Sequence, residues 1–168
     1  KKAEQLLKYH FDYLRAFTLD MFTANEEKAV LAQGELLSTA MFQFYMEELG
    51  EKSFLLSALN FMRIDENEEP DLDYIETHLK LELQRNSSFK FYITQGYICR
   101  NAFGEIDNLK RGGSDYTASL VGAAIHSEEI QIWTDIDGMH NNDPRVVSKT
   151  HPINELSFDE AATCAPVL

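Results

Sequence analysis

The chain has 168 residues, 44% of them hydrophobic and 26% charged, a composition that predicts one soluble globular domain with a sizeable core. Asp and Glu number 28 against 15 Lys and Arg, and the formal net charge of -13 disfavours nonspecific binding to nucleic acid or to anionic membranes. No apolar stretch approaches the roughly 20 residues of a membrane span, the start has no export-signal profile, and Cys99 and Cys164 are expected to be reduced thiols of a cytoplasmic protein.

A long helix is predicted over residues 25–50. Its apolar residues recur at helical spacing, acids fill the first turn, and Gly50 stands where a C-terminal cap is expected. Gly34 lies in the interior of this helix, where it costs roughly 1 kcal/mol relative to Ala. We therefore expect a close approach to the backbone there, either by a functional group or by a packed helix or strand.

The remaining elements follow in alternation. Strands are predicted at 53–58, 89–97 and 129–137, and helices at 74–84, at 115–125 and from Ser157 onward; an acidic loop at 63–73, a polar connection at 99–113 and turns at 138–147 lie between them. Helices that alternate with continuous apolar strands indicate an α/β protein with a mainly parallel sheet covered on both sides.

Ligands of open α/β sheets bind beyond the carboxyl ends of the strands, which directs attention to "RGGSD" at 111–115. Gly112 and Gly113 allow a turn with exposed N–H groups, Ser114 or Asp115 can cap the following helix, and Arg111 offers a planar fork for a carboxylate or phosphate. These residues are compatible with an anion site and also with a capped helix after a tight turn. Asp115 would repel a phosphate unless it orients a cation.

The residue spacing does not match the sequence motifs of other common binding and catalytic sites. The glycines lack P-loop, calcium-loop and dinucleotide-binding patterns, and no G-x-S-x-G is present. The five histidines form no spaced pair with an acid or a cysteine, so no protein metal site is expected.

Four phrases, "AQGELLST" at 32–39, "ITQGY" at 93–97, "RGGSDYTASL" at 111–120 and "IWTDIDGMHNNDPRVV" at 132–147, occur in the order in which aspartokinases carry them. The chain thus resembles that family of the amino acid kinase superfamily over roughly residues 26–162. The resemblance implies a carbamate kinase-like three-layer αβα sandwich, incomplete in this chain. It also implies transfer of the ATP γ-phosphoryl group to the side-chain carboxylate of L-aspartate, giving 4-phospho-L-aspartate, the first step of lysine, threonine and methionine biosynthesis.

The resemblance also assigns the substrate side. Glu35 matches the acid that receives the aspartate ammonium, Tyr97 the aromatic position beside the substrate, and Arg111, with Gly112, Gly113 and Ser114, the group that grips a carboxylate. Asp115 matches the acid that orients the family's catalytic lysine. An ionised carboxylate nucleophile needs no general base, which agrees with the lack of a His or Cys motif.

The nucleotide side follows in the same way. Thr134 and Asp135 match residues that meet the adenosine, and Arg145 matches the arginine that reaches the phosphates. His140 stands where many members carry Tyr, so it is either a nucleotide contact or a turn histidine. Mg²⁺ is expected to arrive with ATP, held largely by phosphate oxygens. The intact protein is expected to be a homo-oligomer.

Parts of the family pattern have no match in residues 1–168. The Lys-Phe-Gly-Gly-Thr-Ser loop and the C-terminal ACT domains are not found, and a segment is expected to be missing between Ala162 and Thr163. The chain is therefore expected to be a partial catalytic domain that is inactive alone. A catalytically dead nucleotide- or amino-acid-binding domain, or a sister kinase of glutamate or acetylglutamate, is the alternative.

Overall fold

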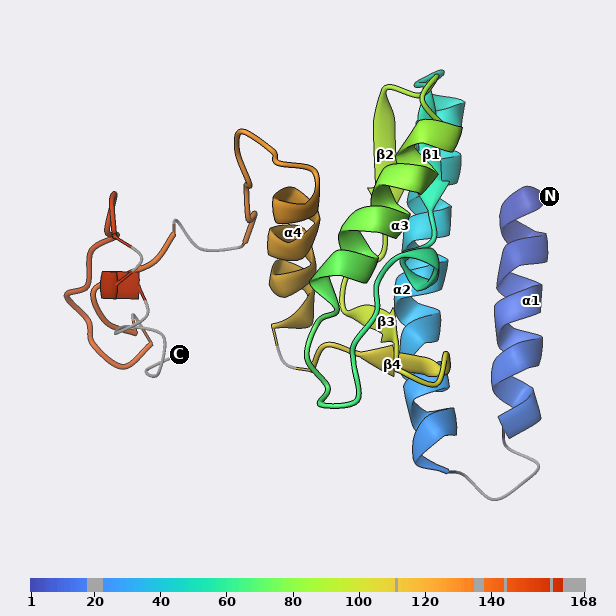
Figure 1. Cartoon of the computed structure of the whole chain (residues 1–168), viewed down its shortest axis with the longest axis horizontal. Coiled ribbons are helices and arrows are strands. Elements are labelled where there is room, and N and C mark those ends of the chain that lie inside the picture. The colour runs from blue at the N-terminus through green and yellow to red at the C-terminus, as the bar shows by residue number, and fades with distance from the viewer. Residues whose placement is uncertain (18–22, 111, 135–137, 144, 158, 162–168) are drawn as a thin grey trace. The chain divides into compact units, whose positions relative to one another are not determined.

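A computed structural model of the chain describes residues 1–17, 23–110, 112–134, 138–143, 145–157 and 159–161 (Figure 1). Contacts divide the chain into two units, Lys1–Ile130 and Gln131–Leu168. The first unit contains all the named elements: α1 (Lys2–Ala16), α2 (Ala24–Glu48), β1 (Ser53–Leu56), α3 (Leu72–Arg85), β2 (Phe91–Thr94), β3 (Ile98–Arg100), β4 (Ile106–Asn108) and α4 (Gly113–Ala124). None of the helices in the described ranges is long and apolar enough to cross a bilayer.

Helix α2 confirms the first predicted helix and its Gly50 cap. A capping box begins it, in which the Glu26 N–H donates to Thr23 Oγ1 (3.3 Å) and the Thr23 N–H donates to Glu26 Oε2 (2.6 Å). Gly50, at φ +77°, donates to the Glu47 carbonyl and ends the helix in the left-handed conformation that favours glycine. The expected close approach at Gly34 is wrong, because a Cβ there would meet no described atom within 4 Å.

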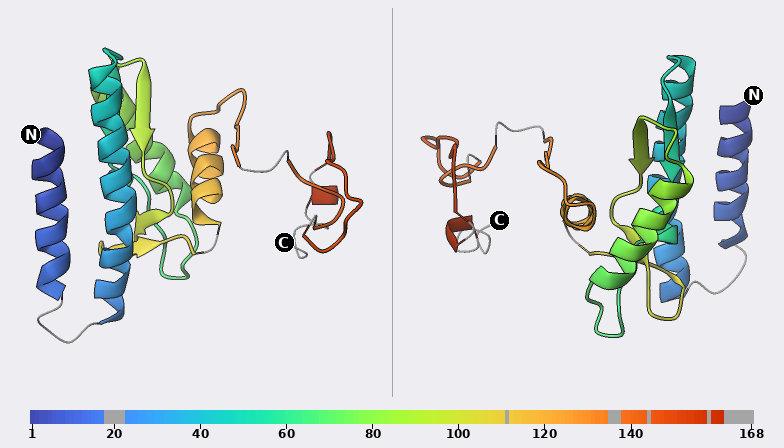
Figure 2. Two further views of the ribbon diagram at one scale, coloured as in Figure 1. Left: turned by 180° about the vertical axis from the view of Figure 1, so that it is seen from behind. Right: turned by 45° about the horizontal axis from the view of Figure 1, so that its top comes forward.

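Strands β1 and β2 form a parallel pair, in register from Ser53 opposite Phe91 to Leu56 opposite Thr94. Helices α2 and α3 lie on opposite sides of this pair, as the views in Figures 1 and 2 show. The core between them is fully buried and apolar; it includes Ala32, Leu56, Phe61, Met62, Ile75 and Leu79. The strands predicted at 53–58 and 89–97 are confirmed over the shorter ranges of β1 and β2, and the helix at 74–84 and the α/β architecture with a parallel sheet between helices are confirmed.

The polar connection predicted over residues 99–113 is wrong, since this segment contains nearly all of an antiparallel hairpin. Strands β3 and β4 pair Cys99 with Asp107, and the polar residues between them build the turn. The Asn101 side chain accepts from the N–H groups of Phe103 and Glu105, both at 3.0 Å. The polarity of this stretch therefore reflects side chains that organise a short hairpin.

Polar contacts with a buried partner help to hold α1 and β4 against α2. His10 Nδ1 of α1, a helix that is not among the predicted elements, lies 2.7 Å from Gln33 Oε1 in a buried contact. Lys28 Nζ donates to Asp107 Oδ2 at 2.6 Å, and the Asp107 side chain is only 9% exposed. The ion pair raises the pKa of Lys28.

The strand predicted at 129–137 is wrong in its described part. Residues 129–134 have no regular structure, and Ile132 and Trp133 are 44% and 87% exposed. An apolar run becomes a buried strand only when a neighbouring strand pairs with it, and no described strand does so here. The predicted cap at Ser157 is confirmed, because Ser157 Oγ accepts from the Glu160 N–H (3.3 Å) and residues 159–161 are helical.

Candidate functional site

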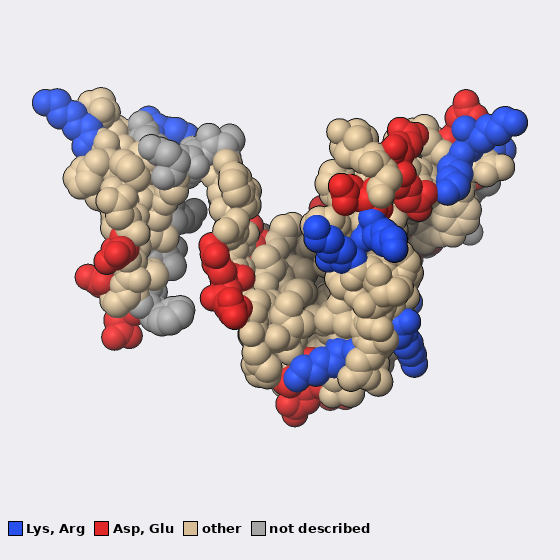
Figure 3. Space-filling model, turned by 90° about the horizontal axis from the view of Figure 1, so that it is seen from above, with Lys and Arg blue, Asp and Glu red and all other residues tan. Residues whose placement is uncertain are grey.

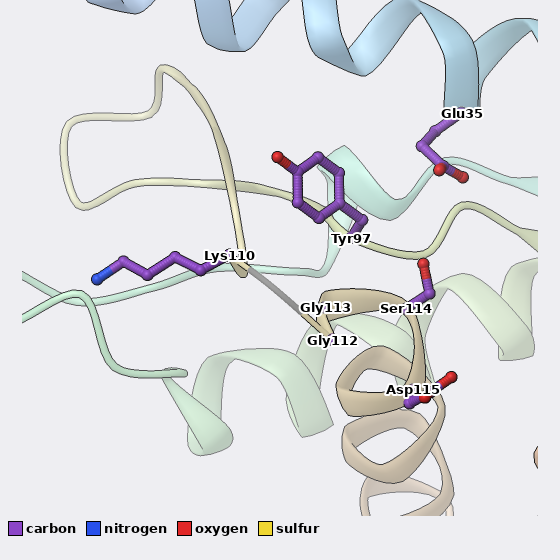
Figure 4. A pocket seen from close by; sticks show the side chains of 7 residues that line it. All are labelled: Glu35, Tyr97, Lys110, Gly112, Gly113, Ser114 and Asp115. Carbon is purple, nitrogen blue, oxygen red and sulfur yellow. The ribbon is translucent and has the colours of Figure 1, made fainter. Parts of the chain in front are cut away.

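A hollow of about 380 Å³ lies at the N-terminal end of α4 (Figure 4). It is lined by Glu35 of α2, Tyr97 after β2, and Lys110, Gly112, Gly113, Ser114 and Asp115. The structure thus brings together five of the residues predicted for the substrate side and a sixth, Asp115, the predicted catalytic acid. Arg111, the remaining predicted member, lies outside the described residues.

Close packing of the chain after β2 against α4 shapes the hollow. A Cβ on Gly96 would lie 3.0 Å from the Cα, Cβ and Oγ of Ser114. A Cβ on Gly113 would lie 2.9 Å from Tyr97 Cδ2 and 3.2 Å from its Cα. Both glycines therefore permit an approach that a larger residue would prevent.

Tyr97 is fixed in a left-handed backbone conformation at φ +68°, which is unusual for a residue with a side chain. Its N–H donates to Thr117 Oγ1 (3.1 Å), and its carbonyl accepts from the Leu109 N–H (2.8 Å). The Thr117 hydroxyl in turn donates to the Gly113 carbonyl (2.7 Å). These bonds stabilise the strained residue and hold its half-buried ring beside the first turn of α4.

A buried amide connects the Glu35 turn of α2 to the ends of both parallel strands. Gln95, 2% exposed, accepts the Ala58 N–H after β1 through Oε1 (2.8 Å) and donates through Nε2 to Thr39 Oγ1 (2.8 Å). The Thr39 hydroxyl donates to the Glu35 carbonyl (2.7 Å). Three segments that are distant in the sequence are thereby held in one arrangement around the hollow.

The predicted capping of α4 by Ser114 or Asp115 is wrong, because the N-cap is Gly112 in a left-handed conformation at φ +74°. Gly112 has no side chain, so no cap side chain occupies the N–H groups of the first turn. A first turn without a side-chain cap and the partial positive charge of a helix N-terminus together favour an anion. The geometry supports the anion site that the sequence left open.

Lys110 lines the hollow, although the sequence prediction omitted it. Its side chain extends away from Ser114 and Asp115 in Figure 4, and Nζ donates to Glu68 Oε2 at 2.5 Å. The hydrogen bond raises the pKa of Lys110 and lowers the pKa of Glu68. A basic residue directly before "RGGSD" was the available signal, but its acidic partner is distant in the sequence.

The residues predicted for the nucleotide side belong to the unit Gln131–Leu168. Thr134 is exposed and has no regular structure, and Asp135 lies outside the described residues. His140 Nδ1 lies 3.1 Å from Thr150 Oγ1. The Arg145 guanidinium pairs with Asp143 through Nε to Oδ1 (3.0 Å) and Nη2 to Oδ2 (2.9 Å), which lowers the pKa of Asp143.

Metal ligands do not gather in the described ranges. No group of three or more His, Cys, Asp or Glu side chains there could hold a metal ion.

On the face shown in Figure 3, Lys and Arg side chains lie interspersed with Asp and Glu.

Comparison with known proteins gives consistent matches. The sequence model of the amino acid kinase family matches residues 3–165. Lysine-sensitive aspartokinase 3 of Escherichia coli (strain K12) is 36% identical over 139 residues, covering 81% of this chain and 31% of that protein. Aspartokinase 1, chloroplastic, of Arabidopsis thaliana is 32% identical over 171 residues, covering 98% of this chain and 29% of that protein. The chain spans about a third of the length of these relatives.

Solved structures agree. The crystal structure of E. coli aspartokinase III in complex with aspartate and ADP superimposes with a TM-score of 0.85 at 32% identity, covering 98% of this chain and 37% of that chain. An aspartate kinase of Clostridium acetobutylicum, 21% identical, has a TM-score of 0.72, covers 95% of this chain and 34% of its own, and shows the fold alone.

Proposed function

Since the chain belongs to the amino acid kinase family, we propose that the protein is an aspartate kinase that transfers the ATP γ-phosphoryl group to the side-chain carboxylate of L-aspartate. One observation carries this proposal: the hollow at the start of α4 is lined by five of the six residues predicted to bind the substrate, together with the predicted catalytic residue Asp115. The similarity to a kinase crystallised with aspartate and ADP supports it.

The substrate side supplies groups of both signs, as an amino acid requires. Glu35 receives the ammonium group of aspartate. Arg111, Ser114 and the Gly112 N–H bind a carboxylate, assisted by the positive end of α4, while Gly113, whose N–H donates to the Lys110 carbonyl, allows the backbone to approach the substrate closely. Tyr97 packs beside the substrate and limits its size.

The chemistry then depends on placement and charge. The attacking carboxylate is ionised at neutral pH, so the protein has to bring two anions together and stabilise the charge on the transferring phosphoryl group. Asp115 acts by orienting the family lysine that meets the phosphates. The hollow holds the attacking carboxylate in position for the transfer, and the reaction requires no acid–base residue.

The nucleotide side is assigned to Thr134, Asp135, His140 and Arg145. Asp143 occupies two of the Arg145 donors, and a guanidinium has five N–H groups, so it can bind a phosphate with those that remain. Mg²⁺ enters with ATP and is held mainly by phosphate oxygens, which suits a cation that binds through a few carboxylates and substrate phosphates.

The full-length protein tests this proposal directly. ATP turnover is measured with L-aspartate, L-glutamate and N-acetylglutamate, and the acyl phosphate is trapped with hydroxylamine. We expect hydroxamate with L-aspartate alone. Hydroxamate from glutamate or acetylglutamate would identify a sister kinase, and aspartate binding without any turnover would identify a binding module.

Glu35→Gln tests the ammonium contact. Removing a charged hydrogen-bond acceptor is expected to raise KM for aspartate roughly 10- to 100-fold with little effect on KM for ATP. Glu48→Gln, at the C-terminal end of α2, is the control and should behave as the wild type. An unchanged KM in Glu35→Gln would remove Glu35 from the site.

A further inference from the structure

Left-handed backbone conformations gather around the hollow. Among the described residues other than glycine, Glu68, Tyr97, Lys110 and His126 have positive φ. Tyr97 and Lys110 line the hollow, and Glu68 is the ion-pair partner of Lys110. Residues with side chains adopt this conformation at an energetic cost, so surrounding contacts must maintain it.

Lys110, at φ +63°, is held from three directions. Its N–H donates to Asn108 Oδ1 (3.0 Å), and its carbonyl accepts from the Gly113 N–H (3.1 Å). Its ammonium group donates to Glu68 Oε2 (2.5 Å). The first two contacts are local, whereas the third ties the segment to a part of the chain 42 residues away.

Glu68 is itself presented by an ordered turn. Asp65 Oδ1 accepts from the N–H groups of Asn67 (2.8 Å) and Glu69 (3.0 Å), and the Glu68 N–H donates to the Asp65 carbonyl (3.1 Å). These bonds hold the Asp65 carboxylate in its charged form and lower its pKa. The ion pair therefore joins Lys110 to a turn whose own hydrogen bonds hold it in place.

Resting on the proposed function, we propose that the Glu68–Lys110 ion pair is a clamp that positions the backbone before α4 for binding the substrate carboxylate. Lys110 is a positioning residue: it lines the hollow and precedes Gly112 and Gly113 in the chain. The ammonium points to Glu68 and away from Ser114 and Asp115, so it acts on the loop and does not contact the substrate (Figure 4).

Steady-state kinetics on the full-length protein with isosteric variants tests the clamp. Both partners are largely exposed, with side-chain exposures of 71% and 58%, so the effect is modest. We expect Lys110→Met and Glu68→Gln to raise KM for aspartate about two- to fivefold, with kcat and KM for ATP unchanged. Lys110→Arg should retain the wild-type KM. Lys8→Met, which breaks an exposed ion pair on α1, is the matched control.

A charge swap separates positioning from direct contact. The double variant Glu68→Lys with Lys110→Glu rebuilds the pair in reverse and is expected to restore KM to within about twofold of wild type, because the clamp needs only the attraction. If Lys110 touched the substrate, glutamate in its place would repel aspartate and the swap would not rescue binding. Any of three results would overturn the clamp: a charge swap that does not restore KM, a lowered KM in Glu68→Gln, or an unchanged KM in both single variants.

Hydrogen exchange of the peptide over residues 108–116 gives a readout independent of activity. Exchange should be faster in both single variants and normal in the swap, because the clamp limits local opening. A wild-type protein without aspartate-dependent turnover would contradict the proposed function but leave this pattern intact. Normal exchange in both single variants of an active enzyme would contradict the clamp alone.

Discussion

At the scale of single residues, two helical glycines make opposite predictions. A Cβ at Gly113 would press on Tyr97, whereas one at Gly34 would enter open space. Gly113→Ala is expected to displace Tyr97, lower the melting temperature and weaken aspartate binding. Gly34→Ala is expected to stabilise the protein by about 0.5 to 1 kcal/mol, because alanine loses less backbone entropy in a helix. Thermal unfolding of both variants checks this.

The two glycine variants serve as controls for each other, since each adds one methyl group to a helix. Equal melting temperatures for both would show that the contact at Tyr97 has no energetic weight. A loss of activity in Gly34→Ala without loss of stability would show that another group does approach that backbone, as the sequence predicted.

Cys99 predicts a pH dependence of stability. Burial, with a smaller contribution from the Asp107 carboxylate, raises the pKa of the Cys99 thiol from 9.0 to about 12. The folded state thus keeps the proton that the unfolded state releases above pH 9, so stability is complete below pH 9 and is lost as pH rises from 9 to 12.

Urea unfolding at pH 8 and pH 10 measures this loss. Wild type should lose about 1.4 kcal/mol more than Cys99→Ala over this interval, since one pKa unit corresponds to that energy. The cavity in the variant lowers its stability equally at both pH values and cancels in the difference. Equal losses would mean that the thiol titrates normally in the fold.

The site residues that could be predicted belong to short sequence motifs at turns of the chain. "RGGSD" and "ITQGY" are local, so the residues they contribute to the hollow could be identified from the sequence. Lys110 could not, because its role depends on Glu68, which the acidic loop brings to it from far along the chain. Spacing along a sequence contains no information about such a contact.

At the scale of elements, the Gln95 amide links α2 to the ends of β1 and β2, so its removal should weaken this link. Gln95→Leu keeps the size of the side chain but leaves the buried Ala58 N–H without its acceptor and removes a donor from Thr39. The expected loss is about 2 to 4 kcal/mol of unfolding free energy, with a raised KM for aspartate because the Glu35 turn loses its link. Denaturant unfolding and steady-state kinetics measure the two effects.

Asn86→Leu is a suitable comparison for Gln95→Leu. It removes an amide that bonds one local carbonyl, that of Glu82, at the end of α3. We expect a smaller loss of stability and an unchanged KM. A variant of Gln95 that loses stability but keeps the wild-type KM would limit the amide to a structural role.

Helices and parallel strands were predictable because their periodicity is local and strong, as in α2 and in the pair β1–β2. Hairpin β3–β4 was not, because three-residue strands with polar turn residues resemble a loop. The opposite error at residues 129–134 has the same origin, since an apolar run has the composition of a strand whether or not a partner pairs with it.

At the scale of the whole molecule, an apolar stripe on α2 and its C-cap residue predicts self-association of the chain. Met41, Tyr45 and Leu49 recur every four residues and are 38% to 57% exposed, and Phe42 beside them is 51% exposed. Contiguous exposed apolar surface of this kind favours association. Sedimentation velocity of the 168-residue chain should show concentration-dependent oligomers, and Phe42→Glu with Tyr45→Glu should reduce them.

The control for the stripe carries the same added charge elsewhere. Leu72→Glu with Leu81→Glu places two acids on exposed positions of α3. If both double variants dissociated the oligomers equally, general charge repulsion and not the stripe would be responsible. A wild-type chain that is monomeric at every concentration would contradict the prediction.

The ion pair between Lys28 and Asp107 has a consequence for the order of folding. It joins residues 79 positions apart, so its formation closes a long loop and must wait for hairpin β3–β4. We expect a contact of this kind to form after the rate-limiting barrier, when most of the chain is already compact. Its loss would then appear as faster unfolding with a nearly unchanged folding rate, so the pair extends the lifetime of the native state.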